Sequence, residues 1–188
     1  MVPAMARTAN PEQLTGDVLR LGVIASVDHA GATCTVESGD IVTGDLPWFA
    51  FRAGGLRVWS PPSVGEQCLL LSPEADLENG LVLTGLYCDG FPAPSSDPET
   101  VCLQFADGAM LSYGFAAHAL AVTLPGGGTA TIDAPGGTTW NGPVTFNDDV
   151  TVNATVTATA DVVGGGVSLK GHKHSGVQSG SAQTGAPV

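Results

Sequence analysis

Basic residues are scarce in this sequence of 188 residues. Six Lys and Arg stand against 18 Asp and Glu, which gives a formal net charge of -12, and no basic residue lies between Arg57 and Lys170. A surface of this sign repels phosphate backbones and anionic lipid headgroups. We therefore expect no nucleic-acid partner, and we interpret the excess of acid as a source of solubility.

Long apolar runs are also missing. No stretch approaches the roughly 20 apolar residues that cross a bilayer as a helix, and the first residues lack the basic start and apolar core of a secretory signal. The four cysteines, Cys34, Cys68, Cys88 and Cys102, include no C-x-x-C pair. We expect the protein to be made and assembled in a cytoplasm, with these cysteines as buried free thiols.

Common catalytic signatures are absent from the sequence. It contains no Gly-x-Ser-x-Gly elbow, P-loop, dinucleotide fingerprint or His-Glu-x-x-His motif. His29 and His118 are isolated, in loop or strand contexts. The sequence therefore predicts a protein that is not an enzyme.

The residues that are present predict an all-β chain. Only 13% of the residues are charged, whereas 26 Gly and 13 Pro supply many turns. Residues 1–16 show no periodicity and are predicted to form a flexible arm. Residues 17–90 are predicted to form a small closed barrel of the OB type, with strands at 18–27, 32–37, 41–46, 68–71 and 80–87.

Exposed aromatic residues on such a barrel are a possible binding surface. Trp48, Phe51 and Trp59 could stack on sugars or bases, as in other OB barrels. The acidic surroundings oppose phosphate, so we favour two other roles for these side chains, filling the barrel or contacting another subunit.

A proline-rich stretch follows the barrel. Residues 91–100 contain three prolines and are predicted to form an extended linker. Beyond it, residues 101–105 and 110–115 are predicted to form a hairpin with a two-residue turn at Asp107-Gly108.

Strict alternation dominates the C-terminal half. Between Val150 and Val162 every even position is Val or Ala, and the odd positions are Thr, Asn or Asp. A period of two is typical of β-structure with one dry face. Burial of such small side chains, at about 25 cal/mol per Å², cannot offset backbone ordering at about 1 to 2 kcal/mol per residue. We therefore expect identical faces of other copies to cover it, in an intertwined, trimeric β-helical shaft over residues 101–169.

The shaft leads into Gly171-His172-Lys173-His174, within a tip predicted over residues 170–188. In an extended segment His172 and His174 point to one side. Three chains with two imidazoles each supply 3 × 2 = 6 nitrogen ligands, a set that suits Fe(II) or another first-row ion better than zinc, which prefers four. The alternative is an exposed His-x-His pair at a mobile terminus.

The parity of the alternation changes before this pair. Val167 and Leu169 lie on odd positions, so straight alternation would place His172 and His174 on the face opposite them. The run Gly164-Gly165-Gly166 can reset the register, and Gly171 can supply a second reset by a bulge or bend.

Residues at both ends of the chain resemble one family. Leu46-Pro47-Trp48 with Arg52-Ala53-Gly54-Gly55, then residues 60–73 and 82–87, are similar to the barrel domain of the baseplate assembly protein V family. Residues 168–178 resemble the tip of that family.

This resemblance implies a trimeric OB-barrel collar seated on a baseplate hub protein, a β-helical shaft, and an apex where His172 and His174 of three chains bind one iron ion. It also implies a place in the virion, at the tip of a contractile phage tail. There the spike is driven through the host outer membrane when the sheath contracts. The alternatives are the spike of a related bacteriocin or secretion apparatus, a receptor-binding trimeric fibre, and a metalloenzyme using the two histidines.

Overall fold

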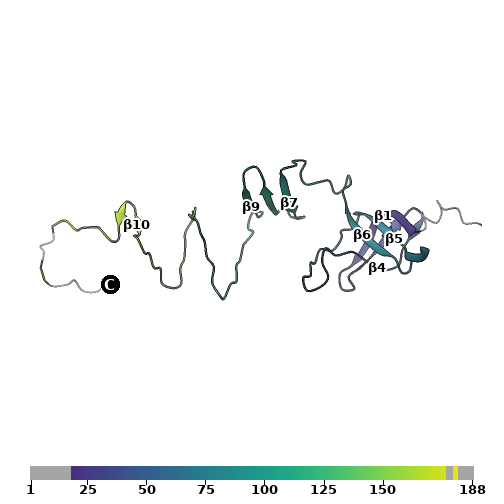
Figure 1. Ribbon diagram of the computed structural model, residues 1–188, viewed down its shortest axis with the longest axis horizontal. Helices are drawn as coiled ribbons and strands as arrows, with labels where there is room; N and C mark the ends of the chain where they lie inside the picture. Colours follow the sequence, from purple (N-terminus) through teal and green to yellow (C-terminus); the bar gives the residue numbers. More distant parts are fainter. Residues whose placement is uncertain (1–17, 177–179, 182–188) are drawn as a thin grey trace, which may run out of the picture. The chain divides into compact units, whose positions relative to one another are not determined.

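The computed structural model describes residues 18–176 and 180–181 (Figure 1). The arm predicted at residues 1–16 and most of the tail after Gly176 lie outside the described residues. Two units meet between Ala130 and Thr131. The regular elements of the described part are eleven strands and one short 3-10 helix, η1 (Pro73–Ala75), so the predicted all-β class is confirmed.

Six strands form the N-terminal barrel. They are β1 (Leu19–Asp28), β2 (Thr33–Ser38), β3 (Ile41–Val42), β4 (Leu46–Pro47), β5 (Gln67–Leu71) and β6 (Leu81–Leu86). The sheet order is β3-β2-β1-β5-β6, and β4 also pairs with β2. Four of the five predicted strands are present, and in place of the one predicted at 41–46 there are two short strands, β3 and β4.

The sheet closes on itself through the residues after β4. Trp48 forms a parallel bridge with Val82 of β6, and the Phe49 N–H donates to the Val82 carbonyl at 2.9 Å. Register shifts occur between β1 and β2 and between β5 and β6, with the extra residue in β1 and in β6, and such bulges bend the strands of small barrels. The inward side chains form one core, made of Ile24, Cys34, Val36, Leu46, Cys68, Leu70 and Val82.

Two of the four cysteines belong to this core. Cys34 and Cys68 are fully buried, whereas Cys88 and Cys102 are half-buried. Burial raises the pKa of Cys68 to about 11, with smaller contributions from Cys34 and Glu66. Burial also raises the pKa of Cys34, helped by Asp45. The predicted buried thiols are therefore confirmed for Cys34 and Cys68, and the other two keep some contact with solvent.

We expect iodoacetamide at about pH 8 to alkylate Cys88 in the native protein and to spare Cys34 and Cys68. The thiolate is the reactive species, and the two core thiols are both inaccessible and protonated at this pH. Peptide mass spectrometry reports each site separately, and labelling in guanidinium chloride should modify all four cysteines. Fast labelling of Cys68 without denaturant would contradict the core described above.

A second sheet follows the proline-rich stretch. Strands β7 (Thr100–Gln104), β8 (Met110–Gly114) and β9 (Ala119–Thr123) form an antiparallel meander. The predicted hairpin between β7 and β8 is confirmed, with Gln104 paired to Met110.

The predicted two-residue turn of this hairpin is wrong. The Gly108 N–H donates to the Phe105 carbonyl at 3.0 Å, and the Phe105 N–H donates to the Ala109 carbonyl at 2.9 Å. The loop therefore has three residues and ends in a bulge at Gly108, whose φ is +89°. The Asp107 carboxylate stabilises this longer loop by accepting the Ala109 N–H at 3.0 Å.

Residues 124–162 contain no strand in the described structure, and their side chains are exposed. The exposed fraction is 55% for Val150, 51% for Val152 and 67% for Val156. In the described part of this single chain nothing covers the alternating apolar face. The β-helical shaft and its three chains stay a prediction.

Candidate functional site

A short hairpin precedes the two histidines. Strands β10 (Val163–Gly164) and β11 (Val167–Ser168) pair in antiparallel fashion across Gly165 and Gly166. These two glycines have φ values of +57° and +83°, the left-handed backbone that a two-residue hairpin turn requires.

This hairpin changes the parity of the apolar face. Gly164 pairs directly with Val167, and paired residues point to the same face of a sheet. The Leu169 N–H donates to the Val162 carbonyl at 2.8 Å, which extends the pairing by one step. Val162, which is even-numbered and precedes the turn, thus shares one face with Val167 and Leu169, which are odd-numbered and follow it. The register reset predicted for the glycine run is therefore confirmed.

Asp161 connects the strand entering the hairpin to the segment that leaves it. Its Oδ1 accepts the Val162 N–H at 2.8 Å and the Lys170 N–H at 3.0 Å. A hydrogen bond from the Ser168 side chain, and then the Lys170 N–H, lower the pKa of Asp161. The carboxylate therefore positions the backbone just before His172.

A turn then places His172. Its N–H donates to the Ser168 carbonyl at 3.1 Å, and the Gly171 N–H donates to the Ser168 hydroxyl at 2.8 Å. The His172 Nδ1 lies 3.1 Å from the Ser168 carbonyl oxygen and 3.2 Å from that of Leu169. Carbonyl oxygens only accept, so Nδ1 carries the proton and Nε2 keeps its lone pair for a metal ion.

The imidazole of His174 lies beside that of His172. Their ring centroids are 5.0 Å apart and the ring planes cross at 80°. Spacing of two residues predicted this juxtaposition. Across the described residues no group of three or more His, Cys, Asp and Glu is placed to hold a metal. The pair thus offers two nitrogens, and further ligands would have to come from elsewhere.

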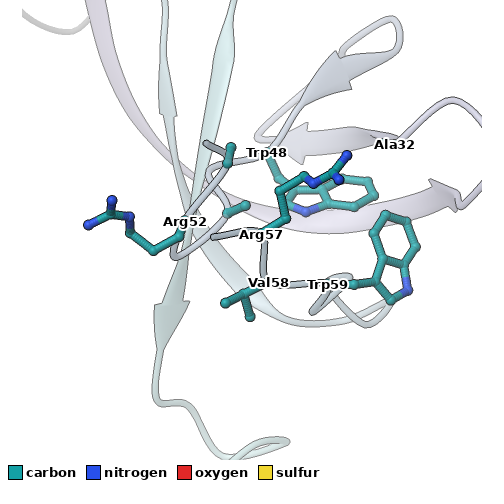
Figure 2. A pocket seen from close by; sticks show the side chains of 8 residues that line it. Ala32, Trp48, Arg52, Arg57, Val58 and Trp59 are labelled. Carbon is teal, nitrogen blue, oxygen red and sulfur yellow. The ribbon is translucent and has the colours of Figure 1, made fainter. Parts of the chain in front are cut away.

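A cavity on the barrel is lined by two of the three aromatic residues singled out in the sequence, Trp48 and Trp59. It has a volume of about 400 Å³, and Trp48, Trp59, Arg52 and Arg57 are among the side chains that line it (Figure 2). The two indole centroids are 5.8 Å apart. Trp48 packs against the barrel core, as one of the two expected roles requires.

Phe51 and Trp59 do not fill the barrel. Their exposed fractions are 85% and 61%, and contact with another subunit stays a prediction for them. Sequence reasoning missed Arg52 and Arg57 as part of this surface. The available signal was that two of the six basic residues of the chain stand within one short stretch.

Known protein families match this chain near both of its ends. Residues 20–87 match the family described as the type VI secretion system and phage-baseplate injector OB domain, and residues 166–188 match the GpV apex motif. The spike protein of Escherichia phage P2 is 36% identical over 128 residues, which are 68% of this chain and 60% of that protein. The chain thus spans about three-fifths of the length of this relative. The resemblance predicted from the sequence is confirmed, and so is the OB domain.

Proposed function

Because an injector OB domain and an apex motif stand at the two ends of one chain that is similar to a phage spike protein, we propose that the chain is the central spike of a contractile phage tail baseplate. The pairing of these two modules in one chain is the observation that carries the proposal. The spike is a structural part of the virion that pierces the host outer membrane when the sheath contracts, after assembly in the host cytoplasm.

Three chains would share one axis. Residues 17–90 form the collar, 91–100 the linker, 101–169 the shaft and 170–188 the tip. The exposed alternating valines support this arrangement, because three copies of the same face can bury one another. Sheath contraction supplies the work, so the spike needs stiffness and a point, and no active site.

At the apex, His172 and His174 of the three chains would bind one iron ion, Fe(II), with six imidazoles. Two features of the single chain fit this donor set: the rings lie side by side, and the backbone carbonyls hold the His172 Nδ1 proton so that Nε2 faces away with its lone pair. The ion, when bound, cross-links three thin chain ends that would otherwise fray.

The collar would contact the baseplate hub protein through the cavity region. Trp and Arg dominate the binding energy of many protein interfaces, and here Trp59, Arg52 and Arg57 are exposed together. This contact also gives a role to Phe51, the most exposed aromatic side chain of the barrel.

Native mass spectrometry combined with elemental analysis tests the proposal. We expect three chains with one iron ion per trimer. A metal-free monomer would contradict it. The matching OB family also includes type VI secretion injectors, so the spike of a related injection device is the second candidate. The genes beside the locus distinguish the two.

A further inference from the structure

A six-residue repeat runs through the shaft segment. Five consecutive repeats cover residues 138–143, 144–149, 150–155, 156–161 and 162–167. The first position is Val in the last four repeats, and the second position is Thr in the first four.

The backbone follows the same repeat. It bends at residues 147–148, 153–154 and 159–160 and turns at residues 165–166, always at the fourth and fifth positions. Gly142, at the fifth position of the first repeat, is also a bend. The sixth position of one repeat and the first three positions of the next therefore form a straight piece between two bends. In such a piece the side chains at the first and third positions of the repeat point to one side and that at the second position to the other.

The third position changes in a regular way. From the first repeat to the last it is occupied by Trp140, Phe146, Val152, Ala158 and Gly164. The side chain becomes smaller at every step toward the apex. The first position shows no such trend, because it is Val in each of the last four repeats.

We infer that these five residues, here called the third-position column, face the common axis of three chains and set the width of the shaft, so that it narrows stepwise to a point. This inference rests on the proposed trimeric spike. Protein interiors fill to nearly crystalline density. Three indoles around an axis hold the chains furthest apart, and three glycines let the backbones approach most closely, just before the histidines.

Gly164 gives independent support. A Cβ added to it would meet no atom of this chain within 4 Å, and its φ lies outside the left-handed range, unlike those of Gly165 and Gly166. Nothing in the described chain therefore requires glycine at this position, although glycine makes a strand less stable. Close approach of three backbones supplies the missing reason.

Two pairs of substitutions in the full chain test the column. Ala158→Phe enlarges the column near the apex, and Thr157→Phe adds the same ring one residue away, on the opposite side. Overpacking three copies should lower the melting temperature of the trimer by roughly 10 °C or more. The iron content of the Ala158→Phe variant should fall well below one ion per trimer. Thr157→Phe should change neither quantity appreciably.

The second pair acts by removing volume at the wide end. Phe146→Ala should lower the melting temperature by creating a cavity at the axis, whereas Thr145→Ala should not. If Ala158→Phe prevents assembly, this second pair still tests whether the third-position column faces the axis. Gly164→Ala should also lower the melting temperature, whereas Gly142→Ala, equally free of contacts in the chain, should not.

The outcomes separate the two proposals. If the unsubstituted protein is a trimer and each variant behaves like its control, the third-position column is overturned and the spike stands. If the unsubstituted protein is a monomer, the proposed function fails, and the column fails with it. Losses confined to the column variants support the inference.

Discussion

Replacing His172 and His174 together with Ala is expected to remove all metal from the protein while leaving three chains associated. The two imidazoles lie side by side and are the only ligands that the proposed apex draws from each chain. Their loss takes away all six nitrogens. Association is expected to survive, because in the proposed trimer the apolar faces of the shaft, and not the apex, would bury most of the shared surface.

Elemental analysis and native mass spectrometry measure the two effects on the same sample. Iron should fall from one ion per trimer to none, and the melting temperature should fall as well, because a metal that binds only the folded protein stabilises it. Lys173→Ala is the matched control and should retain the iron. Dissociation of the double variant into monomers would show that the apex, and not the shaft, provides most of the free energy of association. Iron retained by the double variant would show that the ligands are other residues.

The barrel was predictable because its signals are local. Alternating apolar residues separated by Gly, Asp and Ser gave the strands to within a few residues. The hairpin after the linker was predicted with the wrong loop, since Asp-Gly suits both a two-residue turn and a three-residue loop with a bulge. The choice depends on the Asp107 carboxylate, which accepts the Ala109 N–H in the longer loop.

The apex was predictable only in part. Spacing of two residues was enough to bring His172 and His174 together. The roles of Asp161 and Ser168 were not visible, because the Asp161 carboxylate reaches the Lys170 N–H only after the chain reverses at Gly165 and Gly166. The shaft could be predicted as a dry face but not as a packed object, since nothing in the described part of the single chain covers that face.

Glycine inside the barrel poses a similar problem, because the sequence does not distinguish a required glycine from a tolerated one. Gly22 lies in β1, which runs between β2 and β5 and pairs with both. A Cβ at Gly22 would meet the Val36 side chain and would lie 2.9 Å from the Glu37 carbonyl oxygen. That oxygen belongs to the backbone of β2, where Glu37 pairs with Val23, so it cannot move without disturbing the pairing of the two strands.

Gly22→Val is therefore expected to destabilise the barrel by at least about 3 kcal/mol, a large fraction of the stability of a small domain. Denaturation in urea, followed by the fluorescence of Trp48 and the other indoles, measures the free energy of unfolding. Gly54→Val is the control, because a Cβ there meets nothing within 4 Å and the φ of Gly54 is not left-handed. It should change the stability little. Equal stability of the two variants would contradict the close approach of β1 to β2, and with it the closed barrel that the proposed collar requires.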